Sequence, residues 1–243
     1  MIRNSILTTS LMVATAALGS SAASAQVRET VNAISKTDVA VSLYGAFNGT
    51  TNGNGTTQSP ANAAGGLIEV RHIVNPIIGY EGTYSFNRAN QTYSQNSYAV
   101  CGVCSLTAAT TPVSADAHQV TGNWVASLEF ANLRPFALAG GGILFNQPSN
   151  GQSTTTTIVT GCGGGNPNCT PGSSTTSTTP TASSTKGVFD YGAGLDWGPL
   201  PHLGLRFQYR GNLYKAPDLA KLYTSTGAFT HTSEPMIGVY FRL

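Results

Sequence analysis

Hydrophobic and polar residues alternate with a period of two through most of the chain after residue 37. In the segment 38–48, DVAVSLYGAFN, Val39, Val41 and Leu43 share one face, and Ala40 and Ser42 share the other. Successive side chains of a β-strand point to opposite faces, so this pattern predicts a strand whose faces meet different surroundings. Seven more segments alternate in the same way: 65–75, 77–87, 117–128, 134–145, 188–197, 203–213 and 234–243.

The connections between these segments alternate strictly between long and short. The short ones lie around Asn75-Pro76, 132–134 and 199–201, and the long, polar ones cover 48–64, 88–116, 146–186 and 214–233. In an up-and-down meander this order places every short turn at one end and every long loop at the other. We expect the low-complexity third loop to bury no core and to be mobile.

The two faces decide which side of the sheet is inside. One face is rich in large apolar residues, and in 134–145 we assign Phe136, Leu138 and Leu144 to it; the other combines small residues with nearly all the charge. A soluble calyx, the alternative, would present a solvent face unusually poor in Lys and Glu. Charged residues make up only 9% of the chain, against about 25% in soluble domains. We therefore predict an all-β fold: an eight-stranded antiparallel up-and-down transmembrane β-barrel with short periplasmic turns and long external loops.

The last segment, EPMIGVYFRL, reads as a strand, and a closed barrel pairs its last strand with its first. GVYFRL resembles the C-terminal signal of bacterial outer-membrane proteins, although Leu243 replaces the terminal aromatic residue. Together with GYEGTYSF, RPFALAGGG and GLRFQYRG, it makes the chain resemble the small bacterial outer-membrane barrels of OmpA- and OmpX-like type. This resemblance implies a Gram-negative source, contact with outer-membrane lipid and lipopolysaccharide, insertion by the barrel-assembly machinery through the C-terminal strand, and a monomer.

The N-terminal residues predict export. Arg3 precedes a mostly apolar stretch that ends in Ala-Ser-Ala, so residues 1–25 form a secretory signal peptide cleaved after Ala25. The apolar stretch is too short for the alternative, a membrane anchor. We divide the remainder into a periplasmic leader, 26–37, and the outer-membrane barrel, 38–243.

The charged residues of the small-residue face are predicted to lie in the lumen. They are Glu69, Arg71, Glu81, Asp190, Asp196, Arg206, Arg210, Glu234 and Arg242. Folding about the short turns places Arg71 opposite Glu81, and Asp190 opposite Arg210. We interpret these residues as an ion network that plugs the lumen, since eight strands leave little space inside; a gate or proton path is the alternative.

Two sets of residues are predicted outside the lumen. Cysteines in an exported chain predict disulfides, most simply Cys101–Cys104 and Cys162–Cys169, with pairing between the two loops as the other option. Interfacial aromatic girdles are predicted from Trp124, Trp197, Tyr80, Tyr84 and Tyr209, and Tyr44 is a further candidate. The histidines suggest no metal site.

These features favour a structural or surface-contact role, with no cofactor and no catalysis. The net charge of +2, without a basic run, argues against nucleic acid, although the long loops could contact a surface ligand. A small pore or a transporter of hydrophobic ligands is the alternative. A lipid A hydrolase is a third hypothesis, because outer-membrane deacylases use a His-x-Ser pair with a Glu. Here His231 and Ser233 form the pair, but the adjacent Glu234 alternates to the opposite face.

Overall fold

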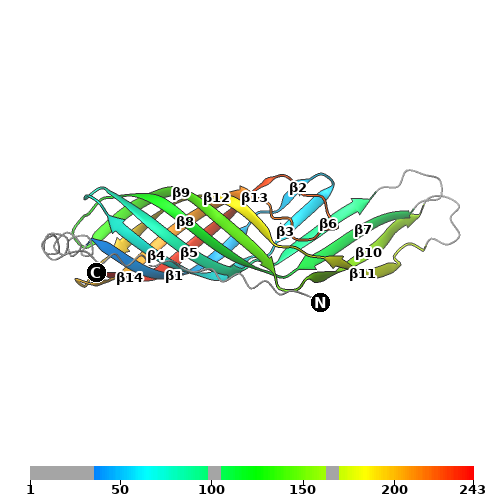
Figure 1. Ribbon diagram of the computed structural model, residues 1–243, viewed down its shortest axis with the longest axis horizontal. Coiled ribbons are helices and arrows are strands. Elements are labelled where there is room, and N and C mark those ends of the chain that lie inside the picture. The colour runs from blue at the N-terminus through cyan, green and yellow to red at the C-terminus, as the bar shows by residue number, and fades with distance from the viewer. Residues whose placement is uncertain (1–35, 98–104, 163–169) are drawn as a thin grey trace, which may run out of the picture. The chain divides into compact units, whose positions relative to one another are not determined.

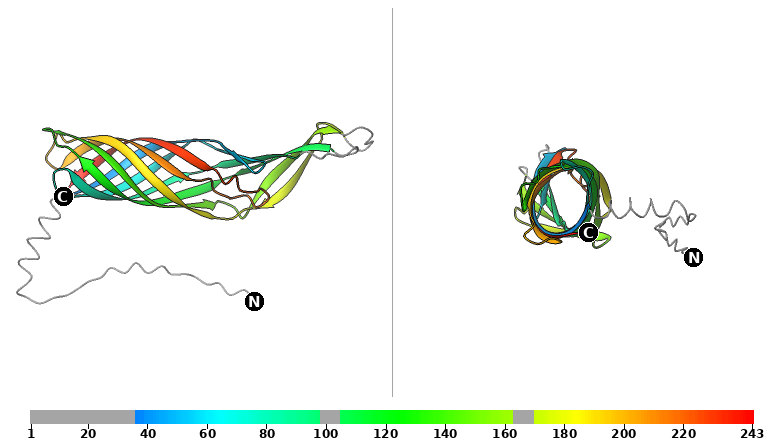
Figure 2. Two further views of the ribbon diagram at one scale, coloured as in Figure 1. Left: turned by 90° about the horizontal axis from the view of Figure 1, so that it is seen from above. Right: turned by 90° about the vertical axis from the view of Figure 1, so that its left-hand side faces the viewer.

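The computed structural model describes residues 36–97, 105–162 and 170–243, and eight of its strands form a closed antiparallel barrel (Figures 1 and 2). Asp38 of the first strand pairs with Arg242 of the last, which closes the ring. The predicted architecture is confirmed. The barrel strands are β1 (Thr37–Asn48), β4 (Ala63–Ile73), β5 (Ile78–Arg88), β8 (Ala115–Ser127), β9 (Leu133–Pro148), β12 (Ser184–Trp197), β13 (Leu203–Lys215) and β14 (Phe229–Arg242).

A second, six-stranded sheet continues beyond the barrel at the end opposite the C-terminus (Figure 1). Its strands, in the order β11-β10-β7-β6-β3-β2, come from three of the long connections, which we had expected to be polar loops. The third of these connections forms β10 and β11 in the part that the structure describes, and its mobility stays a prediction. Threonine is β-branched and favours strands, and Thr155 and Thr179 are buried on the inner face. The strands are β2 (Thr51–Gly53), β3 (Thr56–Pro60), β6 (Gln91–Ser97), β7 (Ser105–Val113), β10 (Gln152–Cys162) and β11 (Ser174–Pro180).

The segment 216–228, between β13 and β14, lies between the two edges of this second sheet. On one side the Lys221 N–H donates to the Pro180 carbonyl oxygen at 3.0 Å. On the other side the Asn54 amide donates to the Ser225 carbonyl oxygen at 2.7 Å. The segment thus bridges β11 to β2.

A small apolar core holds the segment in place. It consists of Tyr93, Val113, Ala115, Leu219, Ala220 and Tyr223. The Tyr93 hydroxyl donates to the Pro217 carbonyl oxygen at 2.6 Å and accepts from the Leu219 N–H at 3.0 Å. Burial raises the pKa of the Tyr93 hydroxyl above its ordinary value.

The barrel is apolar outside and charged inside. Phe207, Ile237 and Val239 expose 42%, 53% and 46% of their surface, whereas Arg206 and Arg210 expose none. A water-soluble barrel requires the reverse arrangement, and a lipid-facing barrel requires this one. Within the described ranges no helix is long and apolar enough to cross a membrane.

The face assignment of β9 was wrong. Phe136, Leu138 and Leu144 are each 5% exposed and point inward, whereas the small residues Ala137, Ala139 and Gly141 face outward. Phe136 fits among the lumen charges because its ring lies 3.9 Å below the Arg71 guanidinium, a cation–π contact. Tyr44, a candidate girdle residue, also points inward and is 5% exposed.

The predicted strand register is correct at one turn and shifted at another. Arg71 pairs directly with Glu81 across β4 and β5. Asp190, however, faces Asn212, and Arg210 faces Gly192. The β12–β13 hairpin is centred one residue later than predicted, and such a shift moves the cross-strand register by two residues.

Candidate functional site

The barrel lumen near the short turns is filled by a salt-bridge network centred on Asp196. Its carboxylate accepts hydrogen bonds from Arg206 Nε at 2.7 Å, Arg134 Nη2 at 2.8 Å and Arg71 Nη1 at 3.3 Å. These three arginines come from β13, β9 and β4, so the network ties distant strands together across the axis.

Each arginine also binds a second carboxylate. Arg71 donates to Glu81 at 2.6 and 2.8 Å, Arg206 donates to Glu69 at 2.9 Å, and Arg134 donates to Asp38. The connected bridges contain four arginines, Arg71, Arg134, Arg206 and Arg242, and four carboxylates, Asp38, Glu69, Glu81 and Asp196. The network is therefore charge-balanced, which is what buried ions require.

A smaller cluster lies nearer the long loops. Arg210 Nε lies 3.1 Å from the Glu234 carboxylate and 3.6 Å from the Asp190 carboxylate, and Arg210 Nη1 donates to Thr83 at 3.2 Å. The Asn123 amide donates to Asp190 at 2.9 Å. Asp190 and Arg210 thus meet inside the lumen although they are not directly opposite on the sheet.

Sequence reasoning missed two members of the network, Asp38 and Arg134. Asp38 lies on the opposite face of the first strand from Val39, and Arg134 lies on the same face of β9 as Phe136 and Leu138. A charged residue on a membrane strand identifies the face that points into the lumen, so the position of Arg134 could have shown that Phe136 and Leu138 point inward.

Little free space remains above the network. A cavity of about 20 Å³, lined in part by Gln119, Asn212 and Glu234, has room for about one water molecule. The lumen is therefore packed by side chains at this level.

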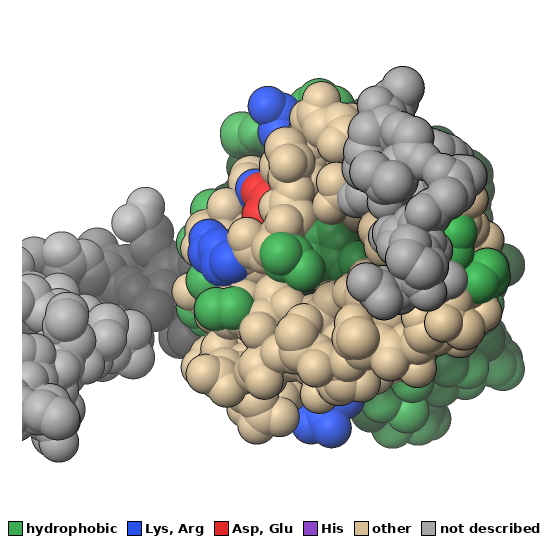
Figure 3. Space-filling view, turned by 90° about the vertical axis from the view of Figure 1, so that its right-hand side faces the viewer, with side chains coloured by type: hydrophobic (Ala, Val, Ile, Leu, Met, Phe, Trp, Pro, Cys, Tyr) green, Lys and Arg blue, Asp and Glu red, His purple; other side chains and the backbone are tan. Residues whose placement is uncertain are grey.

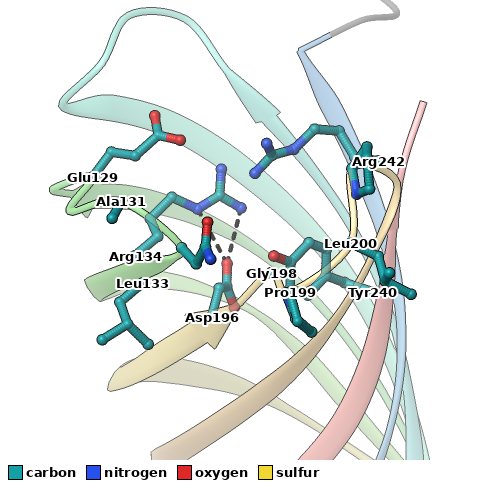
Figure 4. Close-up of a pocket in the computed structure, with 12 residues that line it drawn as sticks. Glu129, Ala131, Leu133, Arg134, Asp196, Gly198, Pro199, Leu200, Tyr240 and Arg242 are labelled. Carbon is teal, nitrogen blue, oxygen red and sulfur yellow. Dashed lines mark hydrogen bonds and ion pairs between the residues drawn. The ribbon is translucent and has the colours of Figure 1, made fainter.

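A larger pocket, of about 270 Å³, opens at the short-turn end (Figure 4). Arg134 and Asp196 form part of its floor, and Glu129, Tyr240 and Arg242 line it as well. The charged network is thus accessible from this end.

The predicted girdle aromatics all face outward. The exposed fractions are 68% for Trp124, 43% for Trp197, 50% for Tyr80, 43% for Tyr84 and 43% for Tyr209. Their placement at a lipid–water interface stays a prediction.

Only one of the four cysteines lies in the described part of the chain. Cys162 ends β10 and pairs in register with Ser105 of β7, whereas Cys101, Cys104 and Cys169 lie outside the described residues. The disulfide pattern stays a prediction.

The His-Ser pair lies on the outer face without a nearby acid. Ser233 Oγ is 3.5 Å from His231 Nδ1, and His231 Nε2 is 2.9 Å from the Tyr191 hydroxyl. Glu234 points into the lumen and binds Arg210. Among the described residues no carboxylate bonds to His231, so this geometry does not assemble a Ser-His-acid triad.

Solved structures similar to this chain are outer-membrane barrels. Neisserial surface protein A has 11% sequence identity over 86% of this chain and 97% of its own, with a TM-score of 0.45. Ail of Yersinia pestis has 16% identity over 86% and 99%, with a TM-score of 0.41. OprG of Pseudomonas aeruginosa has 8% identity over 85% and 95%, with a TM-score of 0.43. No protein-family model and no curated protein sequence matches the chain.

The chain therefore has the fold of a closed, eight-stranded antiparallel β-barrel with an apolar exterior and an ionic interior. The second sheet continues from the end of this barrel that lies opposite the short turns. Within the described part of this barrel, no group of three or more metal-ligating side chains is placed to hold an ion.

Proposed function

We propose that this outer-membrane barrel has a structural and surface-contact role, that its lumen does not conduct at rest, and that it carries no catalysis. The observation that carries the proposal is the buried network around Asp196. The side chains of Arg71, Arg206 and Asp196 have no exposed surface and are joined by ion pairs across the barrel axis. A permeating ion would have to displace these groups, so they block a continuous aqueous path.

Export and insertion belong to the same proposal. The signal peptide, residues 1–25, takes the chain to the periplasm, and the C-terminal strand presents the barrel to the assembly machinery. Lipid and lipopolysaccharide then surround the outward aromatic and aliphatic residues.

As in outer-membrane barrels, we assign the short turns to the periplasmic side and the second, six-stranded sheet to the extracellular side. The surface contact is assigned to this extracellular sheet. The segments 49–62, 89–115 and 147–185, which build this sheet, contain no Asp, Glu, Lys or Arg. Viewed end-on in Figure 3, the extracellular end shows mostly uncharged polar side chains and backbone around a small apolar patch. A surface of this kind recognises a partner through hydrogen bonds and shape, and such contact depends little on ionic strength.

Planar-bilayer recording tests the closed lumen against the alternative of a small pore or a hydrophobic-ligand transporter. The purified protein should give no steady open channel, whereas a wide porin inserted under the same conditions should conduct. Steady, large currents from the wild-type protein would overturn the proposal.

A further inference from the structure

We propose that the periplasmic pocket binds a small zwitterion that carries an ammonium and a carboxylate, such as an amino acid or a dipeptide. The pocket is lined by Glu129, Arg134, Asp196, Tyr240 and Arg242, among others. This inference goes beyond the structural role, because ligand binding at the mouth of the lumen does not require the lumen to conduct.

Two arginines offer donors to a carboxylate. Arg134 uses Nε and Nη2 to bind Asp196 and Asp38, and within the described part of the chain its Nη1 makes no hydrogen bond. Arg242 Nε lies 3.5 Å from the Asp38 carboxylate, and the Arg242 side chain is 36% exposed. Guanidinium groups bind carboxylates with matched, charge-assisted hydrogen bonds, so the free N–H groups can hold one carboxylate.

Glu129 supplies the complementary site for an ammonium group. Its carboxylate forms no ion pair with any residue that the structure describes, and the network below it is already charge-balanced. In Figure 4, Glu129 and Arg242 lie on opposite sides of the pocket, with the Arg134 guanidinium between them. A simple anion would meet Glu129 without compensation, whereas a zwitterion satisfies both sides.

The size of the pocket limits the ligand. A volume of about 270 Å³ falls just below the range of about 300–1,000 Å³ typical of small-molecule sites. Leu133, Pro199 and Leu200 are among the apolar residues that line the pocket. An alanine dipeptide carries both charges and only methyl side chains.

The test is a titration of the ¹⁵N-labelled full-length barrel in nanodiscs, followed by the Nε–H signals of its arginines. L-alanyl-L-alanine is compared with its N-acetyl and C-amide forms, each of which lacks one charge. The free dipeptide should shift the signals of Arg134 and Arg242 and bind about tenfold more tightly than either blocked form, since a charged hydrogen bond contributes at least that factor. Equal affinity for a blocked form, or no saturable shift at millimolar concentration, would overturn the proposal.

Variants assign the two ends of the ligand. Glu129→Gln should reduce the affinity for the free dipeptide to that of the N-acetyl form, and Arg242→Gln should reduce it to that of the C-amide. Arg88→Gln, at an exposed arginine near the extracellular end, is the control and should leave the affinity unchanged. If the two pocket variants bind like the control, the site is wrong.

Discussion

Asp196→Asn is the sharpest test of the idea that the ion network holds the barrel together. The substitution keeps the volume of the side chain and removes one charge, which leaves four buried or half-buried arginines facing three carboxylates. Removing one partner from a buried ion pair costs about 3–5 kcal/mol, because the remaining charge stays desolvated. The loss of stability should stay near the value for one broken ion pair, although Asp196 binds three arginines, because Arg71 still pairs with Glu81 and Arg206 still pairs with Glu69. We expect the free energy of unfolding to fall by about 3–5 kcal/mol.

The measurement is urea unfolding of the barrel in lipid vesicles, followed by the fluorescence of its outward-facing tryptophans. Asp116→Asn is the matched control, because Asp116 pairs at 3.3 Å with Arg88, whose side chain is 67% exposed. An exposed pair of this kind contributes up to about 1 kcal/mol, so the control should lose no more than that. If both variants lose the same free energy, or if Asp196→Asn is more stable than the wild type, the reasoning about the network is refuted.

Two further substitutions test the outer face and the extracellular core. Phe207→Arg places a charge in the apolar belt and should reduce the free energy of folding into vesicles by about 2–4 kcal/mol, whereas Leu200→Arg in a periplasmic turn should cost much less. Equal losses would contradict a lipid-facing Phe207. Leu219→Ala, at a fully buried position, should destabilise the packing of segment 216–228 by about 2–5 kcal/mol and raise its hydrogen-exchange rates, while Leu222→Ala, at a 56% exposed position, should not. Unchanged exchange in Leu219→Ala would show that this core does not hold the segment.

The residues of β9 show where a strand pattern stops being informative. Both of its faces lack charge except at Arg134, so hydrophobicity alone assigned Phe136 and Leu138 to lipid. In the folded barrel the Phe136 ring packs against the Arg71 and Arg206 guanidinium groups, and Leu138 packs with Phe136 and Val125. Arg134 was the one residue of the strand whose charge indicated the inward face, and the partners across the axis show what this face contacts.

The sequence by itself determined the eight barrel strands, the alternation of short turns and long loops, and the outward face of most strands. These properties are local, because the two faces of each strand must suit the lipid on one side and the lumen on the other. The tertiary structure decided what depends on distant segments: the convergence of Arg71, Arg134 and Arg206 on Asp196, and the extracellular sheet bridged by segment 216–228. The physical reason is that register and lumen contacts depend on how the sheet closes, and a shift of one residue in a hairpin centre moves every partner by two.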